Sequence, residues 1–207
     1  MIFTFLKGMA TGGGLILAIG AQNAFVLSQG VRRHHILVIP LICAICDAVL
    51  ISLGVMGLGR IIASSRVLSL VTGLGGAIFL FWYGANAFRS ALRGGRLEAD
   101  QAGKPSLKSA VLATLAVTLL NPHVYIDTII LLGSLAGQFP DPGRVLFGAG
   151  AMTASFIWFF TLSIGAGMLA PLFKKEISWQ ILDSLVGLVM WSIGFSVLRD
   201  ILARVQL

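Results

Sequence analysis

Two aspartates lie within long apolar segments of this sequence. Asp47 follows Cys43-Ala44-Ile45-Cys46, and Asp127 follows Tyr125-Ile126. An unpaired charge at the centre of a bilayer costs at least ~2.5–3.5 kcal/mol on the insertion scale. Residues this costly usually face a cavity or a partner, so both carboxylates are candidates for binding a cationic substrate or a proton. The alternative is an aspartate that only ties helices together through hydrogen bonds.

A histidine precedes the second aspartate at helical spacing. His123 and Asp127 are four residues apart, which places them on one face of an α-helix. An imidazole within reach of a carboxylate is suited to proton exchange near neutral pH. The alternative is a histidine–aspartate hydrogen bond that only positions both side chains.

The pair Asn121-Pro122 predicts a break in the same apolar segment. Asparagine is a favoured N-cap and proline is favoured at the first helical position, so a new helix should begin here. The backbone amides of His123, Val124 and Tyr125 should then be free at a positive helix end, which attracts carboxylates. The alternative is a simple proline kink, which is common in membrane helices.

Two adjacent amides, Gln22 and Asn23, follow Gly20 in the first apolar segment. Amide side chains in apolar surroundings must find hydrogen-bond partners. They either complete the site from the other half of the chain or bond neighbouring helices, and the sequence leaves both readings open.

The remaining reactive residues point to weaker hypotheses. Cys43 and Cys46 form a C-x-x-C pair, which makes a membrane thiol–disulfide conduit an alternative function. Three-residue spacing on a helix disfavours a disulfide, and no second helix offers a partner cysteine. A cation or metal transporter is another alternative, although the acids are few for a metal cage and the histidines do not form a ligand set. No phosphate-binding loop is present, so ATP-driven pumping would need another subunit. We predict a protein without a cofactor that is not an enzyme.

These residues must be positioned by membrane-spanning helices. The chain has 207 residues, of which 57% are hydrophobic and 11% charged, against about 25% charged in soluble domains. The apolar residues fall in blocks near the ~20 residues that one span requires. We predict an all-α integral membrane protein with six spans, at roughly 2–29, 36–59, 67–89, 109–137, 145–170 and 177–198.

The two halves resemble each other. Both begin with a span that carries an asparagine landmark, Asn23 or Asn121, and both end with a span that carries a tryptophan landmark, Trp82 or Trp191. Three-helix units must lie in opposite orientations, and inverted repeats with broken helices indicate a transporter with its site where the repeats meet. We therefore predict a first repeat over 1–95, a basic linker over 96–106 and a second repeat over 107–207.

The charged residues predict the orientation in the membrane. Net charge is +7, and nine of fifteen basic residues lie on the side of the loops after the first, third and fifth spans. The positive-inside rule puts these loops in the cytoplasm and both termini outside, so the basic charge indicates lipid rather than nucleic acid as the partner. We predict that Asp183, near Lys174-Lys175, is a snorkelling or paired surface charge.

Two long motifs resemble the lysine/arginine exporter (LysE) family. They are Gly20–Gly30 and Leu119–Thr128, and Cys46-Asp47 sits where that family has an aspartate in its second span. The resemblance covers essentially the whole chain, and the short link between spans 3 and 4 is similar to that of the arginine-exporter branch. It implies export of L-arginine or L-lysine, and of canavanine, across a bacterial inner membrane. Ala21 replaces a family proline, so the break in the first span is either softer than in the family or held by Gly20 alone.

The residues and the resemblance combine into one predicted mechanism. The cationic group of arginine or lysine would meet Asp47 and Asp127. Its carboxylate would meet the helix end after Pro122, with the remaining contacts from Gln22, Asn23, Asn121 and Tyr125. Moving a positive charge outward opposes an inside-negative potential by ~2.3 kcal/mol per 100 mV, so we expect exchange for an inward proton. Asp47, Asp127 or His123 would carry that proton. The oligomeric state stays open, a homo-oligomer included.

Overall fold

The chain folds entirely into helices over the residues that can be described. The computed structural model describes residues 1–17, 20–57, 66–93, 105–170 and 176–205, and no strand occurs in these ranges. The helices are α1 (Ile2–Ile16), α2 (Ala21–Val31), α3 (Val38–Val55), α5 (Arg66–Leu92), α7 (Leu107–Leu119), α8 (Pro122–Tyr125), the π-helix η1 (Ile126–Leu131), α9 (Leu132–Ala136), α10 (Gly143–Leu169) and α11 (Glu176–Val205).

Among the described residues, three helices are long and apolar enough to cross a membrane. They are α3, α10 and α11, and the number rises to five if the bent pair α1–α2 and the bent segment α7–α9 each count as one span. The remaining long helix, α5, has 27 residues and is not among these candidate spans, so the six-span prediction is confirmed only in part. All of these helices fall on the segments predicted as spans, and the predicted linker lies largely on residues 94–104, outside the described residues.

Both predicted helix breaks are present. The axes of α1 and α2 differ by 80°, and those of α7 and the segment from Pro122 to Ala136 differ by 62°. Gly20 is the N-cap of α2 in an extended conformation, with φ −121° and ψ 175°. The Asn121 side chain caps α8, with proline at the start of that helix. Ala21 in place of the family proline therefore does not restore a continuous helix.

The second broken segment changes its helical pitch. After one α-helical turn, residues Ile126–Leu131 form a π-helix, and the α-helix resumes at Leu132. His123 belongs to the α-helical turn and Asp127 to the π-helix, so the segment between them does not have ordinary α-helical geometry. Short π segments inside α-helices are frequent at functional sites.

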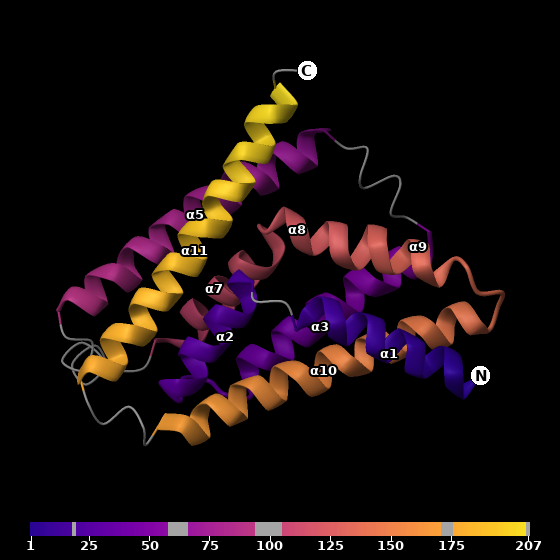
Figure 1. Ribbon diagram of the computed structural model, residues 1–207, viewed down its shortest axis with the longest axis horizontal. Helices are drawn as coiled ribbons and strands as arrows, with labels where there is room; N and C mark the ends of the chain where they lie inside the picture. Colours follow the sequence, from indigo (N-terminus) through magenta and orange to yellow (C-terminus); the bar gives the residue numbers. More distant parts are fainter. Residues whose placement is uncertain (18–19, 58–65, 94–104, 171–175, 206–207) are drawn as a thin grey trace.

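Close helix pairs enclose the broken segments. Figure 1 shows α5 and α11 side by side along most of their length, and α10 runs beside α1 and α3. The α1–α10 contact depends on glycine, because a Cβ on Gly8 would lie 1.9 Å from the Phe147 carbonyl oxygen and one on Gly150 would lie 2.0 Å from that of Phe5. Small residues at such positions let the backbones of two membrane helices approach closely.

Candidate functional site

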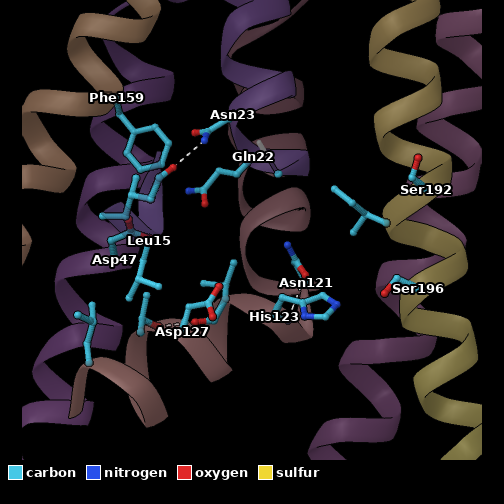
Figure 2. Close-up of a pocket in the computed structure, with 16 residues that line it drawn as sticks. Leu15, Gln22, Asn23, Asp47, Asn121, His123, Asp127, Phe159, Ser192 and Ser196 are labelled. Atoms are coloured by element: carbon cyan, nitrogen blue, oxygen red, sulfur yellow. Dashed lines mark hydrogen bonds between the residues drawn. The ribbon is translucent and has the colours of Figure 1, made fainter. Parts of the chain in front are cut away.

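A cavity of about 350 Å³ lies where the two broken segments meet. Its wall comes from the end of α1, the start of α2, the middle of α3, the segment after Asn121, and parts of α10 and α11. Figure 2 shows Asp47 and Asp127 across the cavity from the two serines of α11. The polar residues of the lining are Gln22, Asn23, Asp47, Asn121, His123, Asp127, Thr128, Ser192 and Ser196. Six of the eight residues predicted from sequence therefore share one cavity, and their role in binding remains a prediction.

Asp47 is held at the cavity wall by a neighbouring helix. It lies in the middle of α3 and is 2% exposed. The Ser155 hydroxyl of α10 donates to its Oδ2 at 2.7 Å. This hydrogen bond fixes the side chain, while no described cation neutralises it. A buried carboxylate in this position favours a cationic ligand or a proton.

Asp127 contributes a second carboxylate that has more freedom. It lies in η1 and is half-buried. Within the described ranges, no hydrogen bond or ion pair to this carboxylate is present, and none joins it to His123. The imidazole and the carboxylate nevertheless line the same cavity, so each remains available to a ligand there.

Asn121 accepts hydrogen bonds from two of the backbone amides that the sequence predicts to be free. Its side-chain Oδ1 accepts from the His123 amide at 3.1 Å, and its carbonyl accepts from the Val124 amide at 3.2 Å. The prediction that both amides await a carboxylate is therefore wrong, because the cap itself satisfies them. Asn121 is 7% exposed and shapes the cavity floor as a structural cap.

The two amides at the start of α2 have different surroundings. Asn23 bridges the first break, since its Nδ2 donates to the Ile16 carbonyl at 2.7 Å and its Oδ1 accepts from the Trp158 indole at 3.1 Å. Gln22 is 9% exposed, and its Nε2 has no hydrogen-bond partner among the described residues. A buried donor without a partner is costly, which makes Gln22 the stronger candidate for a ligand contact.

Two predicted contacts lie outside the cavity. Neither Pro122 nor Tyr125 belongs to its lining, and the Tyr125 hydroxyl donates to the Leu119 carbonyl at 2.6 Å. Tyr125 thus ties the second break together from outside. Pro122 and Tyr125 are three residues apart in α8 and therefore share a helix face, which is not the face that lines the cavity.

The sequence reasoning missed three hydroxyl residues in the lining, Thr128, Ser192 and Ser196. Thr128 directly follows Asp127, and the two serines are four residues apart in an apolar helix. That helical spacing of small polar residues was the available signal. The hydroxyls make the α11 wall polar without adding charge.

Asp183 is not a surface charge. It is 2% exposed, forms an ion pair with Arg32, and accepts from the Ser90 hydroxyl at 2.6 Å. The prediction that Asp183 is paired is correct, but it was expected at the surface near Lys174-Lys175, whereas it is buried and paired with Arg32. The residues joined are 151 positions apart, so only the tertiary fold reveals the pair.

The cysteines and histidines do not form a second centre. Cys43 is buried, Cys46 is partly buried, and neither is in a disulfide. Among the described residues, no three metal-ligating side chains are grouped.

Comparisons with known proteins support this reading of the chain. Residues 14–201 match the family described as LysE type translocator. A putative amino-acid transporter, YggA, of Aeromonas salmonicida is 46% identical over 92% of this chain and 93% of its own length. The arginine exporter protein ArgO of Escherichia coli O157:H7 is 41% identical over 100% and 98%, and that of Serratia proteamaculans is 43% identical over 94% and 95%. No solved structure matches. The chain is thus a multi-pass helical membrane protein with a transport function rather than an enzyme, and it belongs to the LysE type translocator family.

Proposed function

We propose that this protein exports basic L-amino acids across the inner membrane, with L-arginine as the main substrate and L-lysine and canavanine as further ones. The observation that carries the proposal is the pair of carboxylates, Asp47 and Asp127, in one cavity between two broken helices. The names of the relatives, arginine exporter and putative amino-acid transporter, agree with it.

The cationic end of the substrate meets the two carboxylates. A guanidinium group offers five donors in a plane and can bond two carboxylates at once. Asp47 accepts a hydrogen bond from Ser155 on one oxygen, and the Asp127 carboxylate has no hydrogen bond or ion pair among the described side chains. The cavity volume of about 350 Å³ lies within the range of small-molecule sites.

The carboxylate end of the substrate meets the start of α2. Gln22 brings a buried Nε2 donor without a partner, and the first amides of an 11-residue helix lie beside it. Helix starts favour anions through their amides and dipole. The amides after Pro122 are less suitable, because Asn121 already accepts from two of them. This arrangement moves the carboxylate contact from the second break to the first.

Coupling to protons follows from charge balance. Exporting one net positive charge against an inside-negative potential costs ~2.3 kcal/mol per 100 mV, and an inward proton cancels this charge movement. Asp47, Asp127 and His123 line the cavity and can each bind the returning proton. Competition between substrate and proton for the same carboxylates provides the exchange.

The proposed architecture has six spans in two inverted repeats. In this scheme α5 is the sixth span, since its 27 residues reach about 40 Å. Each repeat then consists of one broken span and two continuous ones, α1–α2, α3 and α5 against α7–α9, α10 and α11. The pairs α3–α10 and α5–α11 pack across the repeats, which supports this symmetry. The basic loops face the cytoplasm and both termini lie outside.

Counterflow in proteoliposomes tests the substrate. Vesicles loaded with unlabelled L-arginine should accumulate labelled L-arginine, and L-citrulline should not compete because it has the same shape without the charge. An inward proton gradient should accelerate net arginine efflux. Equal competition by citrulline, or transport of divalent metal ions in place of arginine, would contradict the proposal.

A further inference from the structure

The guanidinium group of Arg32 is held inside the helix bundle. Its Nη2 bonds Oδ1 of Asp183, whose side chain is 3% exposed, and its Cζ lies 5.0 Å from the centre of the Trp179 ring. The Ser90 hydroxyl donates to the other carboxylate oxygen of Asp183 at 2.6 Å. Asp183 and Trp179 are four residues apart on α11 and so share a face, while Ser90 comes from α5.

This cluster lies along the same helices as the cavity, towards the loop after α2. Gln22 of the cavity lies in the first turn of α2 and Arg32 is the C-cap of this helix, ten residues later, or about 15 Å at 1.5 Å per residue. On α11, Ser192 of the cavity and Asp183 are nine residues apart, or about 14 Å. Asp183 and Arg32 therefore lie at similar distances along their helices from the cavity, on the side of the loop after α2.

Two residues of α2 that come between Gln22 and Arg32 in the sequence, Phe25 and Gln29, both contact Tyr83 of α5. Gln29 Nε2 donates to the Tyr83 hydroxyl at 3.3 Å, and the rings of Phe25 and Tyr83 meet edge to face at 5.6 Å. Phe25 is 2% exposed. A substrate that passed between α2 and α11 towards the cavity would part these two packed helices, and with them Arg32 from Asp183.

The groups around Arg32 are those that recognise a guanidinium. A carboxylate accepts its N–H donors, an aromatic face attracts its charge, and a hydroxyl orients the carboxylate. When α2 moves, Asp183 is left buried without a cation, which is unfavourable unless another cation replaces Arg32. We propose that Asp183, Trp179 and Ser90 form a loop-side subsite for the guanidinium or ammonium group of the transported amino acid, occupied by Arg32 in this conformation. The choice of ligand rests on the proposed function.

A single and a double variant of the Arg32–Asp183 pair distinguish a substrate-binding role of Asp183 from a purely structural one. Arg32→Gln empties the subsite and keeps its carboxylate. Arg32→Gln combined with Asp183→Asn removes both charges, so no unpaired charge is left in the bundle. If the ion pair only ties helices together, the double variant should either transport normally or change KM equally on both membrane faces. If Asp183 binds substrate, the double variant lacks that contact although its charges balance.

The first measurement is the KM for labelled L-arginine from each membrane face, in inverted and in right-side-out vesicles. The double variant should raise KM at least tenfold on the face that bears the loop after α2 and stay within twofold of wild type on the other. Arg32→Gln alone should lower KM on the loop face, because the competing guanidinium is gone. A double variant with unchanged KM, or with equal changes on both faces, overturns the inference.

The second measurement requires no transport. Asp47→Asn with Asp127→Asn removes the cavity carboxylates, and methylguanidinium binding to the purified full chain is then followed by calorimetry. Adding Arg32→Gln should create one binding site per chain that the parent lacks, and further adding Asp183→Asn should abolish it. Absence of that site overturns the subsite. Failure of the wild-type protein to transport arginine would instead overturn the proposed function, and the calorimetry would still decide the subsite.

Discussion

At the scale of single residues, the cavity separates side chains that hold the structure from side chains that are left for a ligand. The Asn23 side chain bonds Ile16 and Trp158 at the first helix break, and the Asn121 side chain bonds the His123 amide at the second. Gln22 and Asp127 line the same cavity, and neither the Gln22 Nε2 nor the Asp127 carboxylate is bonded to another described side chain. Residue type alone could not make this division, because asparagine and glutamine offer the same groups.

Gln22→Ala should weaken the binding of the substrate carboxylate. A hydrogen bond to a charged group contributes about 1.5–3 kcal/mol, so the KM for arginine should rise roughly 10- to 100-fold in vesicle transport. Agmatine, which lacks the carboxylate, should compete equally well against the wild-type and variant proteins. Gln138→Ala, at an exposed position outside the cavity, is the matched control and should leave KM unchanged. A Gln22→Ala protein that loses agmatine and arginine affinity alike would show that Gln22 only supports packing.

The cysteines should be dispensable. Cys43 is fully buried and Cys46 partly so, both as free thiols in an apolar helix. The double change Cys43→Ala with Cys46→Ala should keep arginine transport within about twofold of wild type, since it removes small packing groups only. Loss of transport at a normal protein level would instead favour the thiol–disulfide conduit.

At the scale of elements, the sequence predicted the helices and their breaks well because both have local causes. Apolar blocks set the spans, and Gly20 and Asn121-Pro122 set the breaks. The π-helical turn at Ile126–Leu131 has no comparable local signal, so the sequence did not predict the change of pitch between His123 and Asp127, although both side chains line the cavity. The sequence did not predict that Ser192 and Ser196 of α11 line the cavity. Which side of a uniformly apolar helix meets a cavity depends on the helices packed around it.

The Asn121 cap should matter for both folding and transport. Asn121→Ala removes the bond to the His123 amide and should lower the free energy of unfolding by about 0.5–2 kcal/mol, measured by thermal denaturation in detergent. Asn121→Ser should retain most of the stability. The matched control is Ser106→Ala, which removes the cap of α7 at an exposed helix start. That change should reduce stability similarly but leave the KM for arginine unchanged, whereas Asn121→Ala should raise it. Identical transport in the two variants would contradict a role for this break in the site.

At the scale of the whole molecule, the long-range contacts are what the sequence could not supply. The Arg32–Asp183 pair joins helices 151 residues apart and converts a predicted surface charge into a buried one. Asp183→Asn would leave Arg32 without its partner, so it is unsuitable as a neutral control for the cavity acids. The meeting of the two helix breaks at one cavity agrees with the sequence analysis, while the inverted-repeat arrangement stays a prediction.

The proposed orientation can be tested by labelling. A single cysteine at position 103, in a background without Cys43 and Cys46, should resist a membrane-impermeant thiol reagent in intact cells, because the basic link faces the cytoplasm. A single cysteine at position 138, in the exposed turn after α9, should be labelled rapidly. The reverse pattern would place both termini in the cytoplasm.

The central claim is that Asp47 and Asp127 bind the substrate's cation and the exchanged proton, and transport by charge-neutral variants tests it most directly. Asp→Asn keeps the size and hydrogen bonding of the side chain and removes its charge and its titration. Asp47→Asn and Asp127→Asn should each insert and fold, yet abolish arginine counterflow and proton-driven efflux in proteoliposomes. Asp141→Asn, at an exposed turn, is the matched control and should transport like wild type. Near wild-type transport by both cavity variants, with unchanged pH dependence, would contradict the account and leave these aspartates a purely structural role.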